Sequence, residues 1–126
     1  MTPEVERRLA KAGRFLGQSK GLSVNEVPEA IIHLSYYAML HAAASVLIER
    51  QGRAPKTHGA IIGQFSQLIR NDGEEARFLG RAFNRAEDTR LAADYSDDVI
   101  PTAEEAAEAR EIAGAFVAYC RSMLAQ

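Results

Sequence analysis

The sequence contains only one cysteine, Cys120, which excludes an internal disulfide framework. A chain without disulfides is typical of a reducing compartment, so we expect a cytoplasmic protein. No uninterrupted apolar run reaches the roughly 18 residues that a membrane span requires. The first ten residues, MTPEVERRLA, are charged where a signal peptide would have its apolar core. The sequence therefore predicts neither a membrane span nor a secretory leader.

The chain also lacks a strong excess of charge of either sign. Its formal net charge is -2 with 25% charged residues, so no global basic field attracts nucleic acid and no acidic tail is present. Any contact with RNA or DNA would need a local basic patch. A length of 126 residues with 47% hydrophobic content suits one domain, and we expect residues 1–126 to form it.

No stretch alternates polar and apolar residues with the period of two that a sheet requires. Apolar residues recur instead at helical spacing. Several of these helical segments begin with a predicted cap, namely Thr2, the Ser23 and Glu26 pair, and the Thr102 and Glu105 pair. Short connections between helices favour an all-α, antiparallel bundle of four to five helices. The first predicted helix runs from Pro3 to about Lys20, and the second begins between Asn25 and Pro28 and ends at about Gln51. The third runs from Thr57 to before Asn71, the fourth from Glu74 to about Ala93, and the fifth from Thr102 onward.

The second of these helices is apolar on nearly every side between residues 30 and 49, AIIHLSYYAMLHAAASVLIE. A helix with this composition belongs in the centre of a bundle. Its polar side chains are exceptions, because a buried polar group costs free energy unless it finds a partner. They are either satisfied inside the core or line a site. These exceptions are His33, Ser35, Tyr36, Tyr37 and His41.

Three of them, His33, Tyr37 and His41, are four residues apart and share one helix face. Such a face can move a proton or orient a phosphate, or its histidines can simply be core residues bonded to a carbonyl or a tyrosine hydroxyl. Two histidines eight residues apart are too distant for one metal ion, and no carboxylate or second cysteine lies at ligand spacing. We therefore expect no metal and no other cofactor.

Three sequence motifs resemble those of the HEPN superfamily of small helical proteins. SYYAMLHAA at 35–43 is followed by PKTHG at 55–59 and RLAADY at 90–95. Their order resembles a stand-alone subgroup with a Tyr-Tyr-Ala-x-x-His-Ala-Ala helix, a Thr/Ser-His-x-Gly helix start and an Arg-x-x-Ala-Asp-Tyr helix end. The resemblance implies a helical bundle that dimerises and is often encoded beside a small nucleotidyltransferase as a toxin-antitoxin pair. It also implies active members that cut RNA without a metal.

The resemblance further implies a catalytic pair formed by an arginine and a histidine on one helix. His41 matches the histidine, but Leu34 occupies the arginine position. Metal-free RNA cleavage needs a general acid or base and a fixed cation, and Leu34 cannot supply the cation. Arg90 is the candidate substitute, although it could equally pair with Asp94 one turn later.

The fourth predicted helix carries a stripe of arginines, Arg77, Arg81 and Arg85, that could follow an RNA backbone. The alternative is a solvated face on which Glu74 pairs with Arg77 and Asp88 pairs with Arg85.

His58 stands at a helix start, where it could face an anion or pack on the second helix. The tyrosines Tyr36, Tyr37 and Tyr95 are expected to be core residues whose hydroxyls bridge helices. The candidate binding residues are therefore His33, Tyr37, His58, Asp94 and Tyr95.

Two functional hypotheses follow, both for a homodimer with the second helix near its interface. The first is a HEPN protein with a degraded RNase motif that binds a partner nucleotidyltransferase, a nucleotide or RNA. The second is an active endoribonuclease toxin that uses His41 with a substitute cation such as Arg90. A helical interaction module without a ligand is a third reading.

Overall fold

The computed structural model describes all residues from 1 to 126 and contains helices but no strands. The all-α prediction is therefore confirmed. The five helices are α1 (Pro3–Lys20), α2 (Pro28–Gln51), α3 (His58–Ile69), α4 (Glu74–Tyr95) and α5 (Ala103–Leu124).

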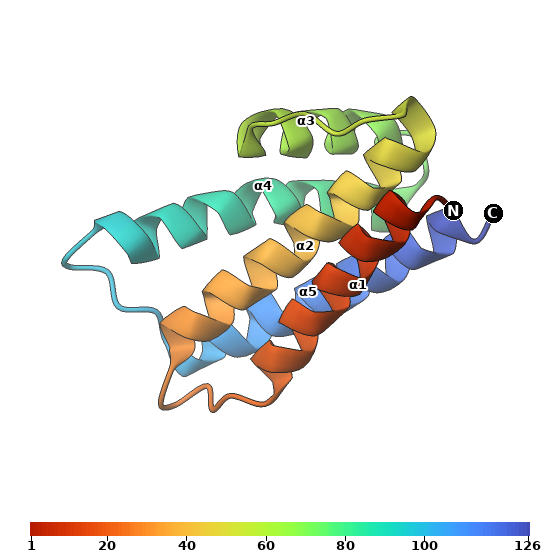
Figure 1. The fold of residues 1–126 in the computed structure, drawn as a ribbon. Helices are drawn as coiled ribbons and strands as arrows, with labels where there is room; N and C mark the ends of the chain where they lie inside the picture. The colour runs from red at the N-terminus through yellow and green to blue at the C-terminus, as the bar shows by residue number, and fades with distance from the viewer.

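Helix α2 occupies the centre of the bundle, as its composition predicted, and packs against all four other helices. α1 and α5 run along it, while α3 folds back beside its last turns and α4 extends from α3 to the opposite end (Figure 1). Fourteen of the 24 residues of α2 are buried. α2 is long and apolar enough to cross a membrane, but 78% of that stretch is buried among the other helices. Its apolar character thus serves the core.

The helix starts that carry a side-chain cap agree with the sequence prediction. The Thr2 hydroxyl accepts a hydrogen bond from the Val5 amide, and Thr102 and Glu105 form the reciprocal capping box of α5. α2 ends at Gly52, whose φ of 86° is the left-handed conformation that glycine adopts without strain. These boundaries depend on contacts between residues close in sequence, which is why the sequence predicts them.

One predicted cap and one predicted helix end differ from the structure. Ser23 and Glu26 form no capping box, since the Ser23 hydroxyl accepts from the Asn25 amide within the preceding turn. α2 begins at Pro28, within the predicted range of Asn25 to Pro28, and the proline ring fixes the φ angle of a first helical turn. α4 extends to Tyr95, two residues beyond the expected end at Ala93.

The core between α3, α4 and α5 contains three packed phenylalanines. The ring of Phe116 lies 4.8 Å from that of Phe83 and 5.2 Å from that of Phe65, measured between centroids. All three side chains are fully buried. Because close-packed rings contribute both apolar burial and edge contacts, this cluster is a main source of stability on the side of the bundle away from α1.

Replacing Phe116 with alanine is expected to lower the free energy of unfolding by about 3 to 5 kcal/mol, because it removes apolar burial and leaves a cavity. The matched control is Phe78→Ala on α4, where the side chain is 44% exposed and the change should stay within about 0.5 kcal/mol. Urea unfolding followed by circular dichroism measures both. Equal losses in the two variants would contradict this description of the core.

Candidate functional site

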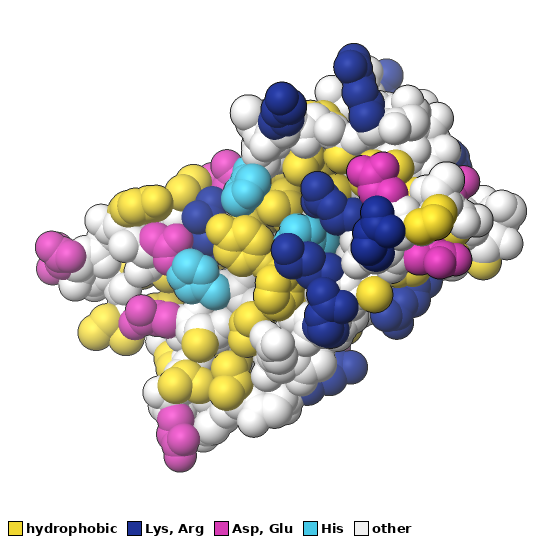
Figure 2. Space-filling model, viewed as in Figure 1, with side chains coloured by type: hydrophobic (Ala, Val, Ile, Leu, Met, Phe, Trp, Pro, Cys, Tyr) yellow, Lys and Arg dark blue, Asp and Glu magenta, His cyan; other side chains and the backbone are white.

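Helix α2 leaves one strip of its central turns partly exposed, formed by His33, Leu34, Tyr37 and His41. We use the term histidine face for the surface formed by this strip together with the side chains that contact it, namely Phe15 of α1 and His58 of α3. Figure 2 shows this side of the molecule, where histidines surround a hydrophobic patch and lysine and arginine side chains gather beside it. Leu34 lies on the strip, as its spacing from His41 predicts.

Tyr37 is the centre of the histidine face. Its ring stacks on that of His33, with centroids 6.4 Å apart and an interplanar angle of 11°. It meets the ring of His58 edge-on at 5.8 Å and that of Phe15 at 6.3 Å. Phe15 also lies 5.6 Å from the ring of His41. The structure therefore brings all three histidines of the chain around one tyrosine.

On the α1 side, His41 contacts a cation that the sequence analysis did not identify. Arg8 Nη1 lies 3.3 Å from His41 Nδ1. A guanidinium can only donate, so Nδ1 accepts the hydrogen bond and the ring proton of the neutral imidazole resides on Nε2. Lys11, one turn along α1, places its Nζ 5.9 Å from the ring centre of Phe15.

Burial, as the largest cause, and the positive charges of Lys11 and Arg8, with His58, together lower the pKa of His41 to about 4. His41 is consequently neutral at pH 7. A neutral imidazole avoids adding a third positive charge to the patch formed by Arg8 and Lys11.

On the α4 side, the Asp94 carboxylate bridges two helices. One of its oxygens pairs with His33 Nε2 of α2, and the other lies 3.2 Å from Arg90 Nη1. The predicted pair between Arg90 and Asp94 is thus present. It also explains why α4 continues past Ala93, because the pair requires residues 90 and 94 to lie one helical turn apart.

Arg90 is only 8% exposed, and its guanidinium lies over the rings of Tyr36 and Tyr37 at 4.9 and 5.9 Å. Burial opposes its charge, but Tyr37, Tyr36 and Asp94 outweigh burial and raise the pKa of Arg90 above its ordinary value. No hydrogen bond joins Arg90 to His41. The cation beside His41 is therefore Arg8, while Arg90 is held in the contact between α2 and α4.

His58 packs on α2, one of the two alternatives that the sequence left open. The hydroxyl of the buried Tyr36 lies 3.1 Å from His58 Nδ1. Burial and the nearby Glu87 carboxylate raise the pKa of Tyr36 to about 12, although Arg90 acts in the opposite direction. Tyr36 therefore remains protonated at neutral pH, and a hydrogen bond joins its hydroxyl to His58.

Tyr95 does not bridge helices, in contrast to the expectation, since it is 79% exposed at the end of α4. The core-facing positions of the last turns of α4 are taken by other residues, including Arg90.

The expected ion pairs on the α4 arginine stripe are also absent. Arg77, Arg81 and Arg85 are exposed, and neither Glu74 nor Asp88 pairs with them. On an exposed surface the gain from such a pair barely exceeds the entropy lost by two long side chains.

Phe15, Arg8 and Lys11 are the site residues that sequence reasoning missed. A signal was present, since α1 carries basic residues at helical spacing, Arg7, Arg8, Lys11 and Arg14. No group of three or more histidine, cysteine, aspartate or glutamate side chains lies close enough to hold a metal ion.

By its fold and its site, the protein is a small all-α bundle with a polar face on its central helix. The family model for the HEPN domain matches residues 5–123. The chain is also 30% identical over 103 residues to a Methanocaldococcus jannaschii protein named "Putative toxin MJ0605", a match that covers 82% of this chain and 75% of that relative. The chain therefore belongs to the HEPN family.

The depressed pKa of His41 is directly measurable by a proton NMR titration of its ring. We expect a pKa near 4, and Lys11→Ala should raise it because one repelling charge is removed. Lys20→Ala, at the far end of α1, should leave it unchanged. Between pH 6.5 and 4 the unfolded chain binds more protons at this residue than the folded chain, so folding stability falls as pH drops through this window. A measured pKa of 6.5 or higher would contradict the geometry.

Proposed function

We propose that this protein is a toxin-type HEPN protein that binds single-stranded RNA on its histidine face. The observation that carries the proposal is the position of two cations, Arg8 and Lys11, beside the rings of Phe15, Tyr37 and His41. Single-stranded RNA presents unpaired bases that stack on aromatic rings and phosphates that require cations. Both requirements are met on one surface.

The basic patch needed for RNA binding is local, as the net charge of -2 requires. A shallow groove on α1 is lined by Arg7, Arg8, Lys11 and Arg14, with Glu4 at one end. These side chains are largely exposed and form no ion pair, so their charges are free to meet phosphates. The groove adjoins the histidine face through Arg8, which contacts His41.

Cleavage of the bound RNA is the second candidate function, and the pairing of Arg8 with His41 favours it. Leu34 stands where the family resemblance led us to expect an arginine on α2. Arg8 of α1 instead places its guanidinium 3.3 Å from the His41 imidazole. Once the scissile phosphate draws the Arg8 guanidinium away from His41 Nδ1, that nitrogen could take the proton of a 2′-hydroxyl as the oxygen attacks phosphorus. The bond to the 5′-oxygen would then break, with a solvent proton reaching the leaving oxygen and Arg8 stabilising the charged phosphorane.

We extend the proposal to a partner and an oligomeric state that would use the same surface. The exposed strip of α2 is the histidine face, so a homodimer with α2 near its interface would place two histidine faces together. The name of the Methanocaldococcus jannaschii relative describes that protein as a toxin. By analogy, a nucleotidyltransferase antitoxin for this chain would act by covering the histidine face and excluding RNA from it.

RNA binding is tested by fluorescence anisotropy with a labelled 12-nucleotide RNA in EDTA, over a series of salt concentrations. Lys11→Ala should weaken binding and reduce the slope of log affinity against log salt by about 0.7, because one phosphate contact is lost. The control is Lys20→Ala, which removes the same charge from the same helix outside the face. No binding by the wild type in low salt, or equal losses in both variants, would refute the proposal.

Cleavage is tested by incubating the same RNA with the protein in EDTA and resolving the products for 2′,3′-cyclic phosphate and 5′-hydroxyl ends. His41→Ala should slow the reaction about 10²- to 10⁴-fold, and Arg8→Ala about 10²- to 10³-fold. Arg90→Gln should act mainly through stability, since Arg90 does not touch His41. Cleavage that persists unchanged in His41→Ala would assign the activity to a contaminant. Absence of cleavage in the wild type would leave RNA binding as the function.

A further inference from the structure

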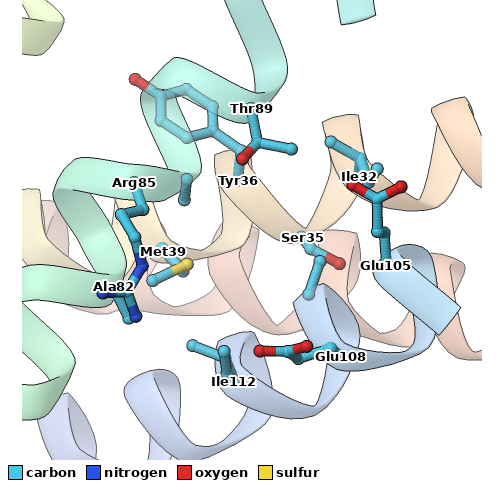
Figure 3. A pocket seen from close by; sticks show the side chains of 12 residues that line it. Ile32, Ser35, Tyr36, Met39, Ala82, Arg85, Thr89, Glu105, Glu108 and Ile112 are labelled. Atoms are coloured by element: carbon cyan, nitrogen blue, oxygen red, sulfur yellow. The ribbon is translucent and has the colours of Figure 1, made fainter. Parts of the chain in front are cut away.

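A cavity of about 210 Å³ lies between α2, α4 and α5, apart from the histidine face. Figure 3 shows its walls, with Ser35 and Met39 projecting from α2, Arg85 from α4, and Glu105 and Glu108 from α5. Apolar side chains form most of the lining, among them Ile32, Met39, Ala82 and Ile112. None of the aromatic residues that form the histidine face lines this cavity.

Ser35 provides the first sign of a ligand. Its side chain is on the cavity wall and only 1% exposed, and its Oγ has no hydrogen-bond partner. An unpaired buried hydroxyl is unfavourable, so native structures seldom retain one without a reason. A ligand in the cavity would supply the missing partner.

The rim of the cavity carries unpaired charges of both signs. Arg85 of α4 and Glu108 of α5 line it from different helices, and neither forms an ion pair. Figure 3 shows them on separate sides of the cavity. Glu105 adds a second carboxylate, although one of its oxygens already accepts a hydrogen bond from the Thr102 amide. A ligand with a single negative charge would be repelled by the carboxylates, and one with a single positive charge by Arg85.

We infer that this cavity binds a small zwitterion with an apolar side chain, of the class of α-amino acids such as phenylalanine or leucine. The ligand carboxylate pairs with Arg85 and its ammonium group with Glu108, while the side chain enters the apolar part beside Met39. Ser35 completes the site by hydrogen bonding one of the two charged groups. The size is suitable, because an apolar cavity of about 150 Å³ already holds benzene.

The tests of the cavity and the tests of RNA binding alter different residues. Tyr36 is not suitable for substitution, because it lines the cavity and its hydroxyl also contacts His58 of the histidine face. In Figure 3 that hydroxyl points away from the other lining side chains. Variants are therefore best made at Arg85 and Ser35, neither of which contacts the histidine face.

Isothermal titration calorimetry of the full chain with L-phenylalanine and L-leucine tests the inference. We expect at least one of them to bind, and the matched probes 3-phenylpropionate, 2-phenylethylamine and glycine to bind at least tenfold more weakly. These probes lack the ammonium group, the carboxylate and the apolar side chain, respectively. Failure of both amino acids to bind, or equal affinity for a probe that lacks one of the charges, would overturn the inference.

Two variants locate the binding. Arg85→Gln should weaken it at least tenfold, whereas Arg81→Gln, one turn earlier on α4 and outside the cavity, should leave it unchanged. Ser35→Ala should weaken binding while raising the melting temperature of the ligand-free protein, because the unpaired hydroxyl is removed. Equal effects of Arg85→Gln and Arg81→Gln would overturn the inference, and so would unaltered affinity in Ser35→Ala.

Discussion

The burial of α2 is the constraint on which the rest of the structure depends. This helix is apolar on nearly all sides, so exposing it to water costs free energy and neighbouring helices must cover it. Four helices provide that cover and leave a single strip partly exposed. The polar residues that α2 could not place in an apolar core, His33, Tyr37 and His41, lie on that strip. The position of the candidate site is thus a consequence of how the core closes.

The two edges of the histidine face have different electrostatic roles. At one edge Asp94 neutralises the nearly buried Arg90 and also contacts His33, which fixes the end of α4 against α2. At the other edge the α1 cations are unpaired, and Arg8 and Lys11 help to keep His41 neutral. The first edge is structural and the second is available to a ligand. This asymmetry explains why an anion would approach from α1 rather than from α4.

Tyr36 lies between the histidine face and the cavity, the two candidate sites of the bundle. Its ring lines the cavity between α2, α4 and α5, and its hydroxyl is hydrogen bonded to His58 at the start of α3. The side chain is nearly fully buried, with Arg90 stacked on its ring. Close packing of this kind leaves little room for independent movement of the two surfaces. The single helix α2 therefore supplies residues to both sites from different sides.

The sequence alone determined the helices and most of their ends, because caps such as Thr2, Thr57 and Thr102 act within three residues. It also predicted the strip on α2 and the pair between Arg90 and Asp94, which follow from the helical period. The partner of His41 could not be predicted in this way. Arg8 lies 33 residues earlier, and only the packing of α1 on α2 decides which turns of the two helices meet. Side-chain complementarity along the whole interface sets that register, and no local spacing encodes it.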